Sequence, residues 1–337
     1  MTLFDSISDK KVLIVGDVML DTYVQGTVSR ISPEAPISVV EEQSVTYFPG
    51  GAGNVATNLA ALGAEAYVVG GVGDDDSASV LRDRLTSRGV KVSGLVTLKS
   101  RPTTTKTRIV AHSQQMLRID RERSHPLDSS EEDAILASIS GLIDKVGACV
   151  LSDYAKGILT PRVCGGIIER ARSLNLPVVI DPKGKRFEKY SGATVITPNL
   201  EEAKQAISVL NGADVELGTD EEIEIFAAKL VAHYQSSILV TRGAQGMSLL
   251  RAGTDAVHIP ARARHVYDVT GAGDTVVALL ALGLASGLPL EAAARLGNWA
   301  AGVVVSKLGT SSVTLAELQQ ALQSEALDQP DAAGADS

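Results

Sequence analysis

One short segment of the chain, Asp268-Val-Thr-Gly-Ala-Gly-Asp-Thr275, combines the residue types that phosphoryl transfer needs. It leads into an apolar stretch, 276–284, with the composition of a buried helix. Glycines let the backbone turn tightly at a helix start, and the first N–H groups of a helix lack partners and attract anions. We therefore predict that the amides of Gly271, Ala272 and Gly273 form an anion hole for a phosphate group.

The acidic residue that ends this Gly-Ala-Gly-Asp run, Asp274, falls in the first turn of the predicted helix. A carboxylate there can accept the proton of an attacking hydroxyl, while the amides neutralise the charge that develops on the phosphoryl group. The sequence thus predicts an ATP-dependent kinase whose catalytic base is Asp274. An ordinary helix start, capped by Asp268 or Thr270, is the alternative.

A second glycine-rich segment, Pro49-Gly-Gly-Ala-Gly-Asn54, also leads into a helical pattern. Its glycines let a ligand approach the backbone, and an asparagine offers both a donor and an acceptor to a polyol. We predict that Gly50, Gly51 and Asn54 bind a sugar. Asp153 joins them, because it directly follows a buried apolar run, where a carboxylate is costly unless it binds something. A nucleotide-binding loop is the alternative, although the segment fits neither G-x-G-x-x-G nor the P-loop.

Basic residues indicate a phosphate that the substrate already carries. Between residues 99 and 123, seven basic residues accompany two acidic ones, in a chain whose net charge is -9. We predict that Lys106 and Arg108 from this segment, with Lys156 and Lys183 from loops that follow strands, bind that phosphate by charge-assisted hydrogen bonds. The alternative is that these side chains are solvated surface charges.

Strand and helix patterns alternate along most of the chain. Continuous apolar runs typical of buried parallel strands lie at 11–16, 66–70, 148–152, 178–181, 194–197 and 238–241. Helical stretches lie at 54–62, 77–88, 131–145, 161–174, 200–209, 220–234, 274–286, 290–307 and 314–324. This alternation predicts an α/β fold, a three-layer sandwich with a mainly parallel central sheet.

Two stretches, near 23–48 and 91–120, interrupt this alternation. Both carry short alternating patterns of Val, Ile, Thr and Tyr with prolines, which indicates antiparallel strands outside the main sheet. We expect them to pair as a small β lid on a single domain, 1–322. Residues 325–337 are rich in Ala, Asp and Gly without periodicity, which predicts a disordered tail.

Composition argues against several classes of protein. No apolar run approaches the roughly 20 residues that span a bilayer, and the polar N-terminus lacks the pattern of a signal peptide. An acidic chain is not expected to bind nucleic acid or an anionic membrane. The two cysteines, Cys149 and Cys164, lie in apolar or helical stretches, which is typical of reduced thiols in a cytoplasmic protein.

The two glycine-rich segments, one near each end of the chain, resemble those of the ribokinase-like (PfkB) sugar kinase family. The resemblance extends from residue 11 to about residue 322. It implies that the early segment binds the sugar and that the late one supplies the anion hole and the base. It also implies ATP and Mg²⁺ as cofactors, and a homodimer formed through the lid.

The same resemblance implies roles for other matching residues. Asp17, after the first strand, binds sugar hydroxyls in that family. The Asn199-Leu-Glu-Glu202 element is linked to magnesium and phosphate, which implies that Glu202 holds Mg²⁺ through water. Thr241, Gly243 and Asn298 complete the ATP-binding residues that the family implies.

Within the family, further motifs resemble the branch that phosphorylates D-glycero-β-D-manno-heptose 7-phosphate. They are Asp17-Val-Met-Leu-Asp21, Ser29-Arg-Ile-Ser-Pro-Glu-Ala-Pro36, Leu117-Arg-Ile-Asp-Arg-Glu122, Ser152-Asp-Tyr-Ala-Lys-Gly157 and Asp181-Pro-Lys183. The resemblance implies phosphorylation of the C1 hydroxyl to the 1,7-bisphosphate, in ADP-heptose biosynthesis for the lipopolysaccharide core. Related proteins carry a fused nucleotidyltransferase domain, and we expect the single-function form here.

Three alternatives to this function stay open at this point. The chain could phosphorylate another sugar or sugar phosphate, such as ribose, fructose or fructose phosphate. It could be a non-catalytic sugar sensor on the same fold, although sensors usually lose the base. A nicotinamide dehydrogenase is a third reading of Gly71-Val-Gly-Asp74, but that segment lacks the third glycine at the required spacing.

Overall fold

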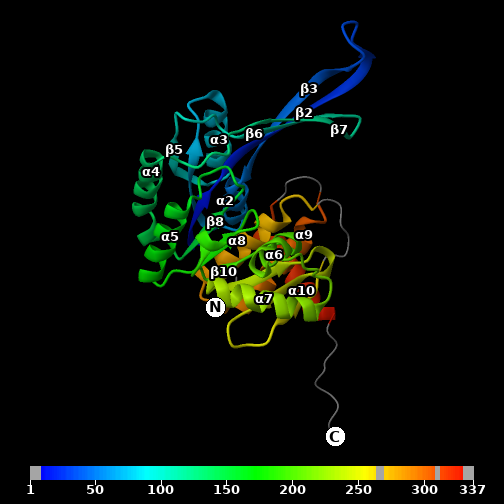
Figure 1. Cartoon of the computed structure of the whole chain (residues 1–337). Helices are drawn as coiled ribbons and strands as arrows, with labels where there is room; N and C mark the ends of the chain where they lie inside the picture. The colour runs from blue at the N-terminus through cyan, green and yellow to red at the C-terminus, as the bar shows by residue number, and fades with distance from the viewer. Residues whose placement is uncertain (1–8, 263–268, 308–311, 329–337) are drawn as a thin grey trace.

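The structure is a computed structural model, and it describes residues 9–262, 269–307 and 312–328. These residues form two sheets and the helices that flank the larger one (Figure 1). The larger sheet has nine strands in the order β13-β12-β11-β10-β9-β8-β1-β4-β5 within the described chain. Their bounds are β1 Lys11–Gly16, β4 Glu65–Val72, β5 Lys91–Thr97, β8 Ala148–Ser152, β9 Val178–Asp181, β10 Val195–Ile196, β11 Ser237–Thr241, β12 Met247–Leu250 and β13 Val257–Ile259.

The strands from β11 to β5 run parallel, and β12 and β13 extend one edge in antiparallel pairing. The interior strand β1 is apolar because both of its faces are covered. Val12 and Ile14 belong to one hydrophobic core, and Leu13 and Val15 belong to the other. All four side chains are fully buried, as expected for a parallel sheet between two layers of helices.

Helices supply those two layers. One core packs against α2 Ala52–Ala61, α3 Asp76–Thr86, α8 Ala272–Ala285, α9 Leu290–Val304 and α10 Leu315–Asp328. The other packs against α4 Ser129–Ser140, α5 Pro161–Ser173, α6 Leu200–Asn211 and α7 Asp220–Tyr234. The predicted α/β sandwich with a mainly parallel central sheet is therefore confirmed.

A second sheet of four strands, in the order β3-β2-β6-β7, lies beside the first. Its strands are β2 Val18–Ile31, β3 Ser38–Gly51, β6 Thr105–Ala111 and β7 Gln114–Arg121. Figure 1 shows the β2–β3 hairpin extending well beyond the body of the molecule. This sheet corresponds to the predicted small β lid.

Two predictions about the lid are wrong in detail. The β2 and β6 strands pair in parallel, because a long connection through β3, α2, β4, α3 and β5 separates them along the chain rather than a hairpin turn. The strand β5 was expected in the lid, but it pairs with β4 at the edge of the main sheet. As an edge strand it has exposed positions, so its sequence alternates like that of an antiparallel strand.

The C-terminal helix is longer than the sequence indicated. The helix α10 continues to Asp328, so the first residues of the tail predicted at 325–337 are helical. The rest of that predicted tail, 329–337, lies outside the described residues. Among the helices that the structure describes, none is both long enough and apolar enough to span a membrane.

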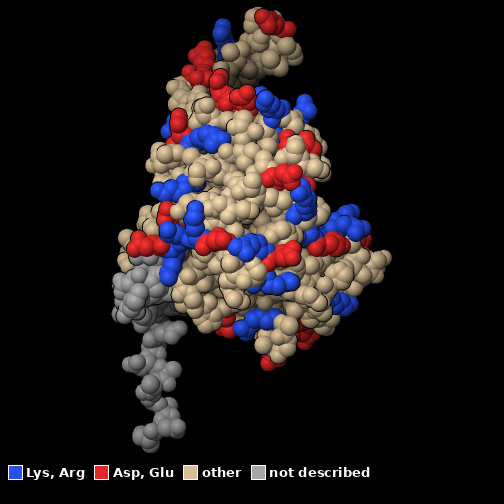
Figure 2. Space-filling view, turned by 90° about the vertical axis from the view of Figure 1, so that its left-hand side faces the viewer, with Lys and Arg blue, Asp and Glu red and all other residues tan. Residues whose placement is uncertain are grey.

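Charges of both signs lie close together on the surface. Figure 2 shows Lys and Arg side chains interspersed with Asp and Glu side chains over the visible face. In the basic segment 99–123, Arg118 pairs with Asp120, and Arg121 pairs with Asp75. The positive charge that the sequence places there is therefore balanced in part by carboxylates, some of them from elsewhere in the chain.

The carboxyl ends of β1 and β8 lie very close together at Gly16. A Cβ atom on Gly16 would lie 2.0 Å from the backbone oxygen of Ser152, its partner across the two strands. We expect Gly16→Ala to lower the free energy of unfolding by about 1–3 kcal/mol, because the strands must separate. Urea denaturation measures this change.

Gly165 provides the matched control. It lies inside α5, and a Cβ atom there would have open space around it. Gly165→Ala should be neutral or stabilising by up to about 1 kcal/mol, because alanine favours a helix. A Gly16→Ala variant as stable as Gly165→Ala would show that this close approach does not constrain the sheet.

Candidate active site

The start of α8 lies at the centre of the candidate site. Gly271 occupies the N-cap position with φ +80°, a conformation that favours glycine, so neither Asp268 nor Thr270 is the cap residue. Asp268 itself lies outside the described residues. The Ala272 N–H donates to the Val269 carbonyl at 3.2 Å, and no described residue accepts a hydrogen bond from the N–H of Gly273 or of Asp274. The helix start thus keeps amides for an anion, although Ala272 contributes less than the sequence predicts.

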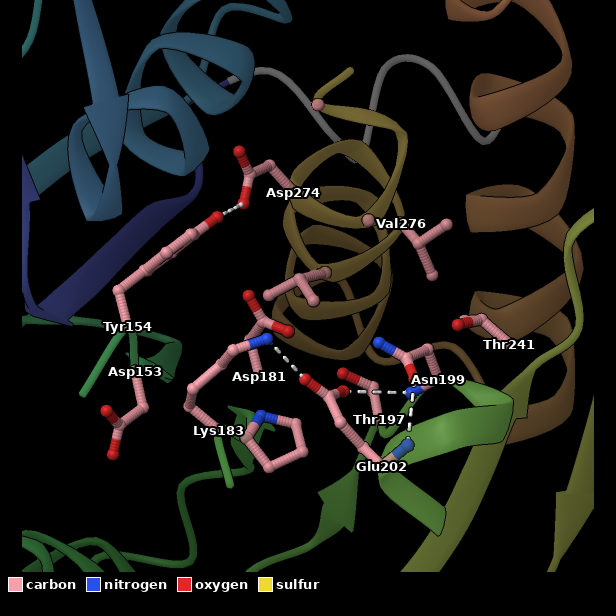
Figure 3. Close-up of a pocket in the computed structure, with 14 residues that line it drawn as sticks. Asp153, Tyr154, Asp181, Lys183, Thr197, Asn199, Glu202, Thr241, Asp274 and Val276 are labelled. Atoms are coloured by element: carbon pink, nitrogen blue, oxygen red, sulfur yellow. Dashed lines mark hydrogen bonds and ion pairs between the residues drawn. The ribbon is translucent and has the colours of Figure 1, made fainter. Parts of the chain in front are cut away.

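Two side chains from distant segments hold the carboxylate of Asp274. Asn54, on α2, donates from Nδ2 to Oδ2 at 2.6 Å, and Tyr154, in the loop after β8, donates from its hydroxyl to Oδ1 at 2.7 Å. Figure 3 shows the Tyr154 ring reaching across the pocket to Asp274. The structure therefore brings together the predicted base and Asn54, from opposite ends of the chain.

The environment of Asp274 suits a group that must accept a proton. Burial raises the pKa of this carboxyl to about 6, the hydrogen bonds from Asn54 and Tyr154 oppose that rise, and the negative charge of Asp21 adds to it. The side chain is only 6% exposed. A carboxyl with a pKa near the working pH is a good general base, because it is ionised and still has affinity for a proton.

A polar cavity of about 200 Å³ opens beside Asp274. Of the predicted site residues it is lined by Gly271, Gly273, Asp274, Asp153, Lys183, Asn199, Glu202 and Thr241. Asn199 and Glu202 form a capping box at the start of α6, and an isolated β-bridge joins Asn199 to Thr241. These contacts hold the loop between β10 and α6 against the end of β11. Both segments line the same cavity as the start of α8.

The charge of this cavity is compatible with a divalent cation that accompanies phosphates. Glu202 contacts Lys183 at 2.8 Å (Oε1 to Nζ) and accepts the Asn199 N–H at 3.1 Å. Asp181 faces the same space, and burial followed by the charges of Asp274 and Glu202 raises its pKa well above the ordinary value. The described residues contain no cluster of three metal-binding side chains. Mg²⁺ usually takes most of its ligands from phosphates and water, so a single carboxylate such as Glu202 fits it.

A second cavity, of about 290 Å³, adjoins the first and is mostly apolar. It shares Thr241, Gly273 and Val276 with the polar cavity, and its other lining residues include Gly243 and Asn298. An apolar pocket that continues into an anion-binding helix start matches the two parts of a nucleotide. The predicted ATP residues Thr241, Gly243 and Asn298 are therefore gathered on one side of Asp274.

The early glycine pair lies against the β1–β2 segment, with Gly50 next to the carboxylate of Asp21 and Gly51 next to the backbone of Asp17. A Cβ atom on Gly50 would lie 2.2 Å from Asp21 Oδ2, and one on Gly51 would lie 2.3 Å from the carbonyl oxygen of Asp17. Gly51 also has φ +58°, so a side chain there would be strained. The glycines thus bring the backbone close to Asp21, whose charge acts on Asp274.

Both predicted sugar-binding carboxylates have partners within the protein. Asp17 is 1% exposed and accepts the backbone N–H groups of Tyr154, Lys156 and Ile158 at 2.8, 3.0 and 3.2 Å. Asp153 contacts Lys189 and Tyr190, and Figure 3 shows its carboxylate pointing away from Asp274. This geometry favours a role in fixing the loop after β8; direct contact with a sugar stays a prediction.

The predicted phosphate-binding cations are all paired. Lys106 contacts Asp120 and Glu122, and Lys156 contacts Glu122. Arg108 pairs with Asp21, and Lys183 with Glu202. The sequence shows the basic residues but not the carboxylates that the fold places opposite them. These cations therefore do not form the unpaired anion site that the sequence suggested.

Sequence reasoning missed three residues that contact or face Asp274, namely Tyr154, Asp21 and Asp181. Each stands in a motif quoted above for a family resemblance, but none was assigned a place in the site. A signal was available for Asp181, because it ends the apolar run 178–181 at the carboxyl edge of the sheet, where ligands bind. For Tyr154 no local signal exists, because its partner lies 120 positions away.

Comparison with known proteins identifies the family. The model of the pfkB family carbohydrate kinases matches residues 9–317. The bifunctional protein HldE of Azorhizobium caulinodans is 44% identical over 313 residues, which cover 93% of this chain and 64% of that protein. The bifunctional protein HldE of Pectobacterium carotovorum is 46% identical over 316 residues, covering 94% and 64%. The chain thus spans less than two thirds of the length of these curated relatives.

Solved structures share the fold at low sequence identity. The ribokinase of Arabidopsis thaliana, complexed with ribose and ATP, superimposes with a TM-score of 0.70 at 20% identity, covering 94% of this chain and 99% of that one. Phosphofructokinase-2 from Escherichia coli, in complex with potassium, gives a TM-score of 0.74 at 18% identity, with the same coverage. At this identity the likeness concerns the fold alone.

The raised pKa of Asp274 gives a prediction about stability. In the unfolded chain an Asp titrates near about 3.9, and in the folded protein this carboxyl titrates at about 6. The folded state therefore binds a proton at Asp274 more tightly than the unfolded chain does. This proton binding adds to the free energy of unfolding at low pH, and the contribution is lost as the pH rises through about 6. The neutral side chain in Asp274→Asn does not titrate, and its amide can accept from Asn54 and donate to Tyr154.

We expect the variant to gain stability relative to the wild type as the pH rises. Between about pH 5 and pH 8 the difference in free energy of unfolding should grow in favour of Asp274→Asn by about 1 kcal/mol. Urea unfolding of both proteins at the two pH values measures it. A difference that does not change with pH would contradict the raised pKa.

Proposed function

The chain belongs to the pfkB family of carbohydrate kinases, and we propose that it transfers the γ-phosphoryl group of ATP to the C1 hydroxyl of D-glycero-β-D-manno-heptose 7-phosphate. The observation that carries the kinase reaction is the buried Asp274 carboxylate in the first turn of α8, next to amides that no described residue satisfies. The heptose phosphate is supported by the motifs quoted above and by the 44% and 46% identity to bifunctional HldE proteins.

In the proposed step the acceptor hydroxyl attacks the γ-phosphorus. Asp274 accepts its proton, the new bond between oxygen and phosphorus forms, and the bond from the γ-phosphorus to the bridging oxygen breaks, so that ADP leaves with the electron pair. The amides of Gly273 and Asp274 donate to the transferred group and stabilise its negative charge. Asn54 and Tyr154 keep the base in place during the transfer.

In this proposal ATP binds along α8. Its base and ribose fit the apolar cavity at Gly243 and Asn298, and its phosphates fit the polar cavity between Thr241 and the start of α8. Glu202 would hold Mg²⁺ through water, and the ion when bound would neutralise phosphate charge. Because ATP is the phosphoryl donor and Cys149 and Cys164 are free thiols, we place the reaction in the cytoplasm.

The pairing of Lys106, on lid strand β6, and Lys156, in the loop after β8, suggests how the substrate phosphate binds. Lys106 and Lys156 converge on one carboxylate, Glu122, with Nζ–O distances of 3.2 and 2.7 Å. A sugar phosphate carries about two negative charges and three acceptor oxygens, so it can compete with Glu122 for both lysines. The ion pairs would then keep these side chains in place until the substrate arrives.

A substrate panel tests the function. ATP turnover is measured with the heptose 7-phosphate, the same heptose without phosphate, ribose, fructose and fructose 6-phosphate, and the product is located by ³¹P NMR. We expect the heptose 7-phosphate to give the highest kcat/KM and a phosphate on C1. A phosphate-free sugar that works best would contradict the substrate assignment and favour another sugar kinase.

Asp274→Asn in the same assay tests the base. We expect turnover to fall by a factor of about 10² or more, within the range for loss of a general base, while the affinity for ATP changes little. A wild type without turnover on any sugar would favour the sensor alternative. A variant that keeps the wild-type rate would exclude Asp274 as the base.

We further propose that two copies pair through the second sheet. Ile31, Leu117 and Ile119 on this sheet, and Ile37 in the turn between β2 and β3, are 51–69% exposed, and large apolar side chains on a surface are candidates for an interface. The double variant Leu117→Thr with Ile119→Thr should make the protein monomeric in sedimentation experiments. Ile225→Thr, which changes an equally exposed residue on α7, is the control. A monomeric wild type would exclude the dimer.

A further inference from the structure

The hydroxyl of Tyr154 contacts the proposed base directly, at 2.7 Å from Asp274 Oδ1. We propose that Tyr154 is a positioning residue that, together with Asn54, keeps the carboxylate of Asp274 ionised and turned towards the acceptor hydroxyl. This inference rests on the proposed function, because it assumes that Asp274 accepts the proton.

The two donors hold different oxygens of one carboxylate. Asn54 binds Oδ2 at 2.6 Å and Tyr154 binds Oδ1 at 2.7 Å, so the plane of the carboxylate cannot rotate without breaking one of the bonds. An ionised carboxylate has about four lone-pair directions, and two of them remain for the acceptor hydroxyl. The arrangement therefore fixes the base and still leaves it able to accept a proton.

The buried carboxylate of Asp17 anchors the loop that carries Tyr154. Its own N–H donates to Asp17, and the N–H groups of Lys156 and Ile158 donate to the same buried carboxylate. Between them, Ala155 has φ +55° and Gly157 has φ +94°, so the loop curls around Asp17 in a conformation that an alanine rarely adopts. This anchoring gives the Tyr154 ring a fixed direction, and it gives Asp17 a role in the site that does not depend on direct contact with a ligand.

The phenol remains a donor under all ordinary conditions. Burial, and then the negative charge of Asp274, raise the pKa of Tyr154 well above its usual value. Two other carboxylates act on this pair. The negative charge of Asp21 disfavours ionisation of Asp274, and Asp181 and Asp274 repel each other when both are ionised. Neither would be removed by a change at Tyr154, so the hydrogen bond can be tested alone.

Tyr154→Phe removes the hydroxyl and keeps the ring. A hydrogen bond to a charged group contributes enough that its loss should move the titration of Asp274 upward by about one pH unit. The carboxyl carbon of Asp274 reports this directly in ¹³C NMR of protein labelled at aspartate, where Asp274→Asn identifies the resonance. In turnover, the loss caused by Tyr154→Phe should be larger at about pH 6 than at about pH 8, because less of the base is ionised at the lower pH.

Tyr67→Phe is the matched control. Tyr67 also donates to a carboxylate, Glu65, at 2.6 Å, but at the opposite end of the sheet from the site. The Tyr67→Phe variant should leave both the titration of Asp274 and the pH dependence of turnover unchanged. If Tyr154→Phe does not fold, as judged by circular dichroism, Asn54→Ala replaces it, because it removes the other donor to the same carboxylate and should move the titration in the same direction.

An unchanged titration of Asp274 in the Tyr154 variant would overturn the inference. So would a loss of turnover that is equal at both pH values, because that is the effect of a residue with only a structural role. The NMR titration needs no sugar and no turnover. A wild type that phosphorylates no sugar would therefore refute the proposed function, while the titration would still decide whether Tyr154 controls Asp274.

Discussion

A buried carboxylate must stay ionised at Asp274, and much of the site is arranged to make this possible. Removal from water favours the protonated form, while the two hydrogen bonds from Asn54 and Tyr154 favour the charged one. Neither donor belongs to the helix that carries Asp274: one comes from α2 and the other from the loop after β8. The base therefore depends on three segments that only the complete fold brings together.

The parallel sheet explains why these segments meet. The strands β1, β8, β9, β10 and β11 all end at the same edge. Their last residues and the loops that follow carry Asp17, Asp153–Lys156, Asp181–Lys183, Asn199 and Thr241. The start of α8 lies against this edge and adds the anion-binding amides, so one edge of one sheet holds both the nucleotide cavity and the base. Gly16 packs closely against Ser152 where β1 and β8 end, so the two strands stay close together at this edge.

Short sequence patterns predicted the features that depend on residues close together in the chain. The apolar strands, the helices and the Gly-Ala-Gly-Asp helix start could be read from the sequence because each depends on residues close together in the chain. The partners of charged groups could not be read in this way. Lys106 and Lys156 are neutralised by Glu122, and Asp153 by Lys189, through contacts that depend on how strands and loops pack. Strand β5 was misassigned for a related reason, since an edge strand of a parallel sheet and an antiparallel strand show the same alternation.

The central claim is that Asp274 accepts the proton of the acceptor hydroxyl with a pKa of about 6. The dependence of kcat/KM on pH in the wild-type enzyme tests it most directly, because this ratio reports the essential groups of the free enzyme. We predict a constant value above about pH 7 and a tenfold fall for each pH unit below about 6, as expected for one ionisable base. A profile that stays flat down to about pH 5 would contradict the claim.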